Sequence, residues 1–283
     1  MMPLGTHESK SDSWKKICCF LIKDFLMPSQ CETRYPHVPI RTFTDPEIPS
    51  YAFIIPLPDV YRHCAELDSS GLKDPKMHET TKISALFNLG RLYADDGSYK
   101  QAIKVYQEAV KKMPHHYQPQ SLYNMMGEAF FKLKQFEEAE RWYQQALRAK
   151  ADHIPAHLTY AKLLSKWDRL SEAEQWFLKA KAIAPNDSSV YQHYGQFLSE
   201  NERDIQAGRN EDAEHYYQVA VKLRPKEVTS HINLGAMLHV NGKLQEAEEA
   251  YLAALRLKPD DPITQNNLQK LRNKNCSETD EKT

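Results

Sequence analysis

The chain contains histidines and glutamates, which can act in catalysis or bind metals, but they are not spaced as either kind of site requires. The glycine-rich sequences that cradle phosphates, G-x-x-x-x-G-K-[ST] and G-x-G-x-x-G, are absent. His78-Glu79 lacks a second histidine at the spacing that puts two imidazoles on one helix face, and the adjacent His115-His116 would point apart on a helix. Glutamate pairs such as Glu137-Glu138 suit solvated helix faces. We therefore predict no catalytic residue, no metal site and no cofactor.

The five cysteines are not spaced as a zinc site or as a disulfide framework. Cys18, Cys19, Cys31 and Cys64 precede residue 65, Cys276 lies near the other end, and no C-x-x-C pair occurs. A disulfide framework would distribute its cysteines through the folded region. The sequence therefore predicts incidental thiols.

Charge and hydropathy exclude several classes of partner. The chain has 283 residues, with 37 Lys and Arg against 38 Asp and Glu. This balance gives no electrostatic reason to expect nucleic acid or an anionic membrane as a partner. No apolar stretch approaches the roughly 18–20 residues of a membrane-spanning helix, and the run 17–22 is too short for a signal peptide. We expect no direct membrane insertion by this chain, and by itself this favours a cytoplasmic location.

An internal repeat defines the elements that must position any binding residues. Five series of similar residues recur along the chain in the same register, at spacings that centre on 34 residues. They are the small residues Gly90, Gly127, Ala161, Gly195 and Gly235; the alanines Ala102, Ala139, Ala173, Ala213 and Ala247; the rings Tyr106, Tyr143, Phe177, Tyr217 and Tyr251; the alanines Ala109, Ala146, Ala180, Ala220 and Ala254; and the terminators Pro114, Ala151, Pro185, Pro225 and Pro259. The pattern predicts five copies of one supersecondary unit.

These residues resemble the tetratricopeptide repeat, a pair of antiparallel helices, over about residues 83–261. Small side chains let the two helices approach closely, the ring fills the wedge between them, and the proline ends the pair. Trp142, Trp167 and Trp176 also fall at repeat positions and are expected to pack rather than to form a ligand cage. The resemblance implies an all-α fold, a right-handed superhelix of about five helix pairs with a C-terminal capping helix.

The remaining segments complete a four-part organisation. We predict a poorly ordered region at 1–56, a short helix and linker at 57–82, the repeat solenoid with its capping helix at 83–272, and a disordered tail at 273–283. The fourth copy carries six additional residues around Asn201–Asn210, which favours a surface loop. A junction between halves of two ancestral repeats is the alternative.

The resemblance also assigns residues to a concave surface, which the first helix of each pair lines in this family. Asn and Gln there suit the backbone of an extended peptide, and Lys suits its acidic groups. A merely solvated groove is the alternative for any single residue. The cationic clamp of the chaperone-binding members has no match in this chain. The candidate partner-binding residues are Arg91, Asn124, Glu128, Lys132, Lys162, Lys166, Gln192, Gln196, Glu200 and His239.

Several stretches resemble one family more specifically. The segments 120–129, 152–160, 193–198 and 257–261 are similar to the C-terminal repeats of the transmembrane and tetratricopeptide-repeat O-mannosyltransferases. That resemblance implies repeats in the lumen of the endoplasmic reticulum, beside a membrane half that uses dolichyl-phosphate mannose to modify cadherin domains. The acidic catalytic residues of the family lie in the membrane half, which this sequence lacks. No catalytic residue can therefore be carried over, and whether this chain takes part in an enzyme stays open.

The function expected from the sequence is thus binding rather than chemistry. The first hypothesis is a peptide-binding solenoid that recognises the acceptor for an O-mannosyltransferase, with a cadherin-like protein as the implied partner. The alternative is a generic cytosolic scaffold for complex assembly. Two N-x-[ST] sequences, at Asn186 and Asn275, would permit glycosylation in a lumen.

Overall fold

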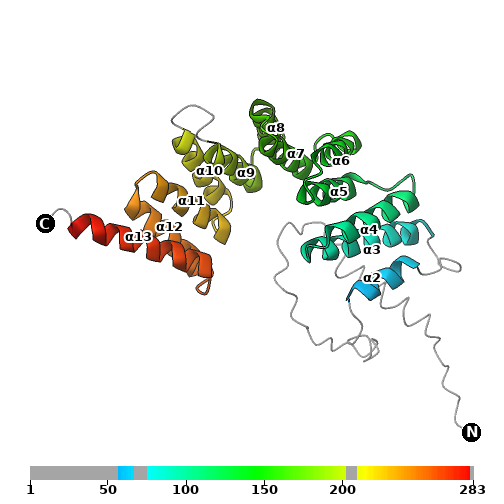
Figure 1. Ribbon diagram of the computed structural model, residues 1–283, viewed down its shortest axis with the longest axis horizontal. Helices are drawn as coiled ribbons and strands as arrows, with labels where there is room; N and C mark the ends of the chain where they lie inside the picture. The colour runs from blue at the N-terminus through cyan, green and yellow to red at the C-terminus, as the bar shows by residue number, and fades with distance from the viewer. Residues whose placement is uncertain (1–56, 67–74, 202–208, 281–283) are drawn as a thin grey trace, which may run out of the picture. The chain divides into compact units, whose positions relative to one another are not determined.

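The computed structural model describes residues 57–66, 75–201 and 209–280 (Figure 1). Within these residues the chain forms twelve α-helices and no strand, which confirms the all-α prediction. The region 1–56, expected to be poorly ordered, and most of the additional residues of the fourth copy lie outside the described residues. No helix among the described residues is long and apolar enough to cross a membrane.

The chain divides into two compact units, residues 1–139 and 140–283. The division falls within α6 (Phe136–Ala149). From α3 to α12 the helices follow one another as first and second helices of successive pairs, as the prediction of five helix pairs requires. The right-handed superhelix stays a prediction.

In the first unit, α2 (Leu57–Glu66) packs on α3 (Pro75–Asp95), which pairs with α4 (Tyr99–Lys112). The next helix, α5 (Gln120–Lys132), packs on α4. An ion pair of 2.6 Å between Arg62 and Glu108 joins α2 to α4. Helix α3 begins before the predicted residue 83, because Pro75 is well suited to the first position of a helix.

One cysteine in this unit departs from the sequence-based expectation. Cys64 is buried in α2 and is disulfide-bonded. The prediction of incidental thiols is therefore wrong for Cys64. The spacing of the cysteines held no signal for this bond, because pairing depends on which segments the fold brings together.

The second unit repeats one arrangement three times. Each first helix packs on its own second helix, and α9 and α11 also contact α8 and α10 of the preceding pairs. The pairs are α7 (Ile154–Lys166) with α8 (Leu170–Ile183), α9 (Ser188–Glu200) with α10 (Arg209–Leu223), and α11 (Val228–Val240) with α12 (Leu244–Leu257).

The last helix, α13 (Pro262–Asp280), covers the end of the final pair. Leu268 and Leu271 are buried against Tyr251 and neighbouring apolar side chains. Asp261 caps the helix start by accepting hydrogen bonds from the backbone N–H and the hydroxyl of Thr264. This confirms the capping helix, which continues past the predicted end at Arg272.

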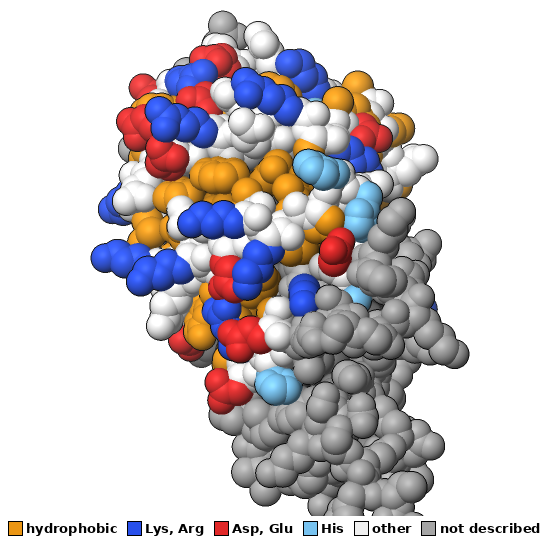
Figure 2. Space-filling view, turned by 90° about the vertical axis from the view of Figure 1, so that its right-hand side faces the viewer, with side chains coloured by type: hydrophobic (Ala, Val, Ile, Leu, Met, Phe, Trp, Pro, Cys, Tyr) orange, Lys and Arg blue, Asp and Glu red, His pale blue; other side chains and the backbone are white. Residues whose placement is uncertain are grey.

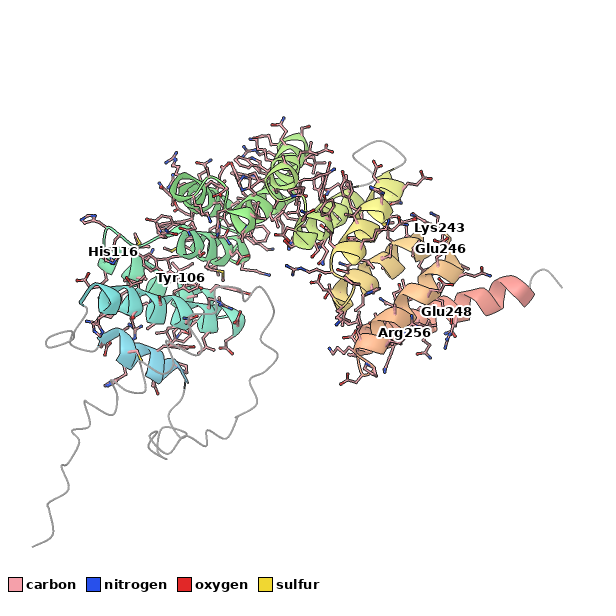
Figure 3. All side chains as sticks on the ribbon, turned by 180° about the vertical axis from the view of Figure 1, so that it is seen from behind. Tyr106, His116, Lys243, Glu246, Glu248 and Arg256 are labelled. Carbon is pink, nitrogen blue, oxygen red and sulfur yellow. The ribbon has the colours of Figure 1, made fainter. Side chains whose placement is uncertain are left out.

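The small and aromatic residues of the repeat lie in the core, as the register predicts. The alanines of both series are fully buried, as are the rings of Tyr106, Tyr143 and Tyr251. Figure 3 labels Tyr106 among the helices of the first unit. Its ring occupies the space that a Cβ would need at Gly90. The close approach of the paired helices therefore rests on these positions.

The described turns inside four of the five pairs share a left-handed backbone conformation that sequence reasoning missed, while the turn of the fourth pair lies outside the described residues. Gly97 and Gly242 have φ of +77° and +75°, and Lys134 and Asp168 occupy the equivalent positions with φ of 60°. Glycine adopts this conformation without a steric penalty, whereas Lys and Asp adopt it at some cost. The turn geometry is thus kept by the packing of the helices, whatever residue fills the position.

A row of glutamates links consecutive copies in the second unit. Each follows a repeat alanine and accepts hydrogen bonds from the next element: Glu140 from Tyr160 and Arg169, Glu174 from Tyr194, Glu214 from Asn241 and Lys243, and Glu248 from Arg272. We call this row the glutamate ladder; Figure 3 labels Lys243 and Glu248. Because each carboxylate bonds to a later copy or, for Glu248, to the capping helix α13, the ladder fixes how neighbouring elements stack.

Candidate functional site

A small hollow of about 20 Å³, open to solvent, lies between α7 and α9 in the second unit. We call it the α7–α9 hollow; its lining residues are Lys162, Ser165, Lys166, Phe177, His193, Gln196, Phe197 and Glu200. Four of the residues nominated from the sequence line it, namely Lys162, Lys166, Gln196 and Glu200. The spacing of the repeat put them on first helices, and the stacking of two pairs brings them to one place.

The charged residues of the hollow are unequally engaged. Lys166 Nζ lies 2.8 Å from Glu200 Oε2, and Gln196 Nε2 donates to Glu200 Oε1 at 2.7 Å. Partial burial opposes ionisation of Glu200, but these hydrogen bonds and the nearby lysine charges lower its pKa. Lys162 is exposed and makes no hydrogen bond or ion pair with the described residues. It is therefore the cation that this hollow offers to a ligand.

His193 contributes a defined hydrogen-bonding group. Its Nδ1 lies 2.7 Å from the backbone oxygen of Ser189, and a carbonyl oxygen only accepts, so Nδ1 carries the proton. Burial lowers the pKa of His193, and the charge of Lys162 lowers it further. The imidazole is neutral at neutral pH and keeps Nε2 as an acceptor.

Gln192 makes structural hydrogen bonds rather than lining the hollow. Its amide nitrogen donates to Glu227 Oε2 and to Ser230 Oγ, both at 2.7 Å. The hydroxyl of Ser230 donates to the same carboxylate at 3.0 Å. This network joins α9 to the start of α11, so the Gln192 amide nitrogen is already used within the fold.

The other nominated residues lie elsewhere. Arg91, Asn124, Glu128 and Lys132 belong to α3 and α5 of the first unit, where Asn124 is buried and Lys132 is exposed. His239 lies half-buried near the end of α11. The structure therefore brings only the set on α7 and α9 together in one hollow.

Arg91 and Glu128 interact electrostatically with the hydroxyl of Tyr106, which is buried and has no hydrogen-bond partner among the described residues. Burial raises the pKa of Tyr106. This phenol therefore stays protonated over the physiological range.

Aromatic rings form the floor of the hollow, which sequence reasoning missed. Phe177 and Phe197 are 2% and 3% exposed and lie with their ring centroids 5.1 Å apart. Phe177 was visible as a repeat ring, but its role in the hollow depends on its contact with the next copy. The hollow thus combines a rim of cation, amide and carboxylate with an apolar floor, a combination typical of ligand pockets. Among the described residues no cluster of three or more His, Cys, Asp or Glu could hold a metal ion.

One face of the molecule carries mixed charge. In Figure 2, which views the right-hand side of Figure 1, acidic and basic side chains lie interspersed around hydrophobic ones, and neither sign gathers into a large patch. This agrees with the net charge of −1.

Two family models described as Tetratricopeptide repeat match the chain, one at residues 93–154 and 130–194 and the other at 203–262. Together they cover more than half of its length.

Curated relatives resemble the chain in its repeat region. The human Protein O-mannosyl-transferase TMTC2 is 49% identical over 238 residues, covering 74% of this chain and 28% of the relative. The mouse protein of the same name is 55% identical over 108 residues, covering 38% of this chain and 13% of the relative. The Drosophila melanogaster Tmtc2 is 36% identical over 137 residues, covering 48% and 15%. This chain thus spans little more than a quarter of the human relative.

Solved structures of similar fold include TTC0263 from Thermus thermophilus, described as a thermophilic TPR protein. It is 16% identical with a TM-score of 0.56, covering 67% of this chain and 98% of that chain. BtubC (BKLC) from P. vanneervenii is 17% identical with a TM-score of 0.54, covering 71% and 87%. At this identity the likeness supports the fold alone.

Proposed function

We propose that this chain binds a partner protein, because it belongs to the tetratricopeptide-repeat family, whose repeats serve as protein-interaction modules. In this proposal the α7–α9 hollow and the first-helix surface around it bind an extended segment of a partner protein. The single observation that carries the proposal is the convergence of Lys162, Gln196 and His193 over the floor of Phe177 and Phe197. An acidic side chain of the partner pairs with Lys162, and its backbone pairs with the amide and imidazole groups.

We further propose that the module is the acceptor-recognition part of a dolichyl-phosphate-mannose-dependent protein O-mannosyltransferase. The similarity to the curated O-mannosyl-transferases over 74% of this chain supports it. The bound segment is then part of a cadherin-like acceptor, and the transfer chemistry belongs to another part of the enzyme. This chain contributes the recognition of the acceptor polypeptide.

The endoplasmic reticulum is the location that this proposal requires. The disulfide of Cys64 supports it, because disulfides persist in the secretory pathway and are rare in the cytosol. A generic cytosolic scaffold is the second candidate, and a reduced Cys64 in cells would favour it.

Reversing the charge of Lys162 tests the groove. We expect Lys162→Glu to weaken binding of peptides that tile an extracellular cadherin domain by about tenfold or more, because the only unpaired cation among the described residues of the hollow is replaced by an anion. Isothermal titration calorimetry on the full chain measures the change.

Lys222→Glu is the matched control, because Lys222 is an exposed lysine on the second helix α10. Binding that responds equally to both variants would place the peptides elsewhere. Absence of any peptide binding by the unmodified chain would remove the acceptor-recognition proposal.

Glycosylation at Asn186 tests the compartment. Asn186 is exposed in the turn between α8 and α9, and it begins an N-x-[ST] sequence. We expect a glycan there in cells, seen as a mobility shift that an endoglycosidase removes and that Asn186→Gln abolishes. Asn275→Gln is examined in parallel because it interrupts the other such sequence. An unglycosylated chain with a reduced Cys64 would instead support the cytosolic scaffold.

A further inference from the structure

A second hollow, of about 320 Å³ and widely open to solvent, lies between the second helices α6 and α8. We call it the α6–α8 hollow; Gln144, Leu147, Arg148, Ala151 and Trp176 line it. None of these residues belongs to the α7–α9 hollow, which first helices provide together with Phe177. The proposed groove function therefore leaves this surface unexplained.

Trp176 is held in a fixed position at the wall of the hollow. Its ring contacts the rings of His157 and Tyr160, at centroid distances of 5.3 Å and 5.1 Å. The ammonium of Lys179 lies 4.1 Å from its ring centroid. The indole nevertheless stays half-exposed. A large aromatic side chain that is already ordered loses little entropy on binding, which is the property of an anchor residue in an interface.

The next junction along the chain shows how this kind of gap is closed. Tyr216 occupies the repeat position equivalent to Trp176, and Lys181 occupies the position equivalent to Leu147. There the Lys181 ammonium donates to the Tyr216 hydroxyl at 3.2 Å and lies 4.9 Å from its ring centroid. Leu147 can make neither contact. The substitution at one repeat position therefore leaves Trp176 without the contact that Lys181 makes with Tyr216, and part of the indole stays open to solvent.

The positive charge at the α6–α8 hollow indicates which kind of partner segment would bind there. Arg148 is the only charged residue among the lining residues, and it makes no ion pair with the described residues. Lys179 adds a second cation beside the indole. The gap thus combines an apolar wall with two cations, which is complementary to an apolar side chain flanked by carboxylates.

We infer that the α6–α8 hollow is a second docking site, and that its occupant is an acidic segment of a partner protein. The segment inserts one large apolar side chain against Trp176 and Leu147. Its carboxylates pair with Arg148 and Lys179. A partner bound here leaves the first-helix surface free, so both sites of the unit can be filled at once.

The test uses the full chain and a blocked synthetic peptide with one central Phe between Asp and Glu residues. We expect this peptide to bind, and we expect Arg148→Glu and Leu147→Asp each to weaken it by about tenfold or more. Lys222→Glu is the matched charge reversal, at an exposed position of α10 outside both hollows, and should leave binding unchanged. Lys162→Glu reports any binding of the peptide in the α7–α9 hollow. Peptides with Ser for Phe, or with Asn and Gln for the acids, should bind about tenfold more weakly. Because Arg148 is exposed, its variant should melt as the unmodified chain does.

The outcomes separate this site from the groove. No binding of the parent peptide would overturn the inference. Binding that Lys162→Glu weakens and Arg148→Glu does not would place the peptide in the α7–α9 hollow and would also overturn it. Loss through Arg148→Glu and Leu147→Asp alone supports it, whether or not cadherin peptides bind in the groove.

Discussion

Replacing Gly90 by alanine will destabilise the first helix pair by about 2 kcal/mol. The new methyl group would lie 2.2 Å from one ring carbon of Tyr106 and 2.5 Å from another, and this ring is fully buried. Overpacking of a core costs about 1–3 kcal/mol, and the close overlap argues for the upper end. The helical preference of alanine over glycine returns about 1 kcal/mol. Urea unfolding gives the change, and hydrogen exchange in α3 and α4 locates it.

Other copies supply graded controls for this prediction. A Cβ at Gly235 would approach Tyr251 to 2.8 Å, and one at Gly195 would approach Tyr217 only to 3.2 Å. We expect Gly195→Ala to be within about 0.5 kcal/mol of neutral, with Gly235→Ala between the two. Alanine already stands at the equivalent Ala161. Equal effects at Gly90 and Gly195 would contradict the packing argument.

Glu214→Ala will cost about 2 kcal/mol, the second largest effect that we expect. Glu214 is 4% exposed, and its carboxylate accepts from Lys243 at 2.7 Å and 2.9 Å and from Asn241 at 2.7 Å. Hydrogen bonds to charged groups contribute about 1.5–3 kcal/mol. The lower part of this range applies because the side chain of Lys243 is 44% exposed and regains water when its partner is removed. Denaturant unfolding of the two chains measures the difference.

This contribution depends on pH in a defined direction. Burial opposes ionisation, but the hydrogen bonds from Lys243 and Asn241 and the charge of Lys243 lower the pKa of Glu214. A carboxyl whose pKa is lower in the folded state stabilises the fold above the unfolded pKa, about 4.3 for Glu, and loses this as the pH falls through the folded value. The gap between unmodified chain and Glu214→Ala should therefore narrow below about pH 4.3.

Glu249→Ala is the matched control for the ladder glutamate. Glu249 is exposed on α12, so its removal should change stability by less than about 0.5 kcal/mol. A gap between Glu214→Ala and the unmodified chain that stays constant down to about pH 3, below the unfolded pKa of Glu, would show that the ion pair with Lys243 is not its source.

The sequence pattern did not predict how neighbouring copies stack on one another. The bonds of Glu140, Glu174 and Glu214 had no signal in the sequence, because a periodic pattern cannot tell a solvated carboxylate from one that meets the next copy. The bonds of these glutamates join residues 20 or more positions apart. Likewise, the position of Trp176 in the repeat predicted that its side chain packs against other residues. In the structure part of its ring lines the α6–α8 hollow, because its neighbour there is Leu147.

The sequence by itself determined the helix pairs, the terminal cap and the first-helix surface. These follow from contacts within about one repeat, where small residues, rings and prolines have a fixed separation along the chain. The tertiary structure alone decided which nominated side chains share a hollow, which are used up inside the fold as Gln192 is, and where Cys64 forms a bond. The physical reason is that these outcomes depend on distances between copies. Such distances are set by how whole helices pack, and no local pattern encodes them.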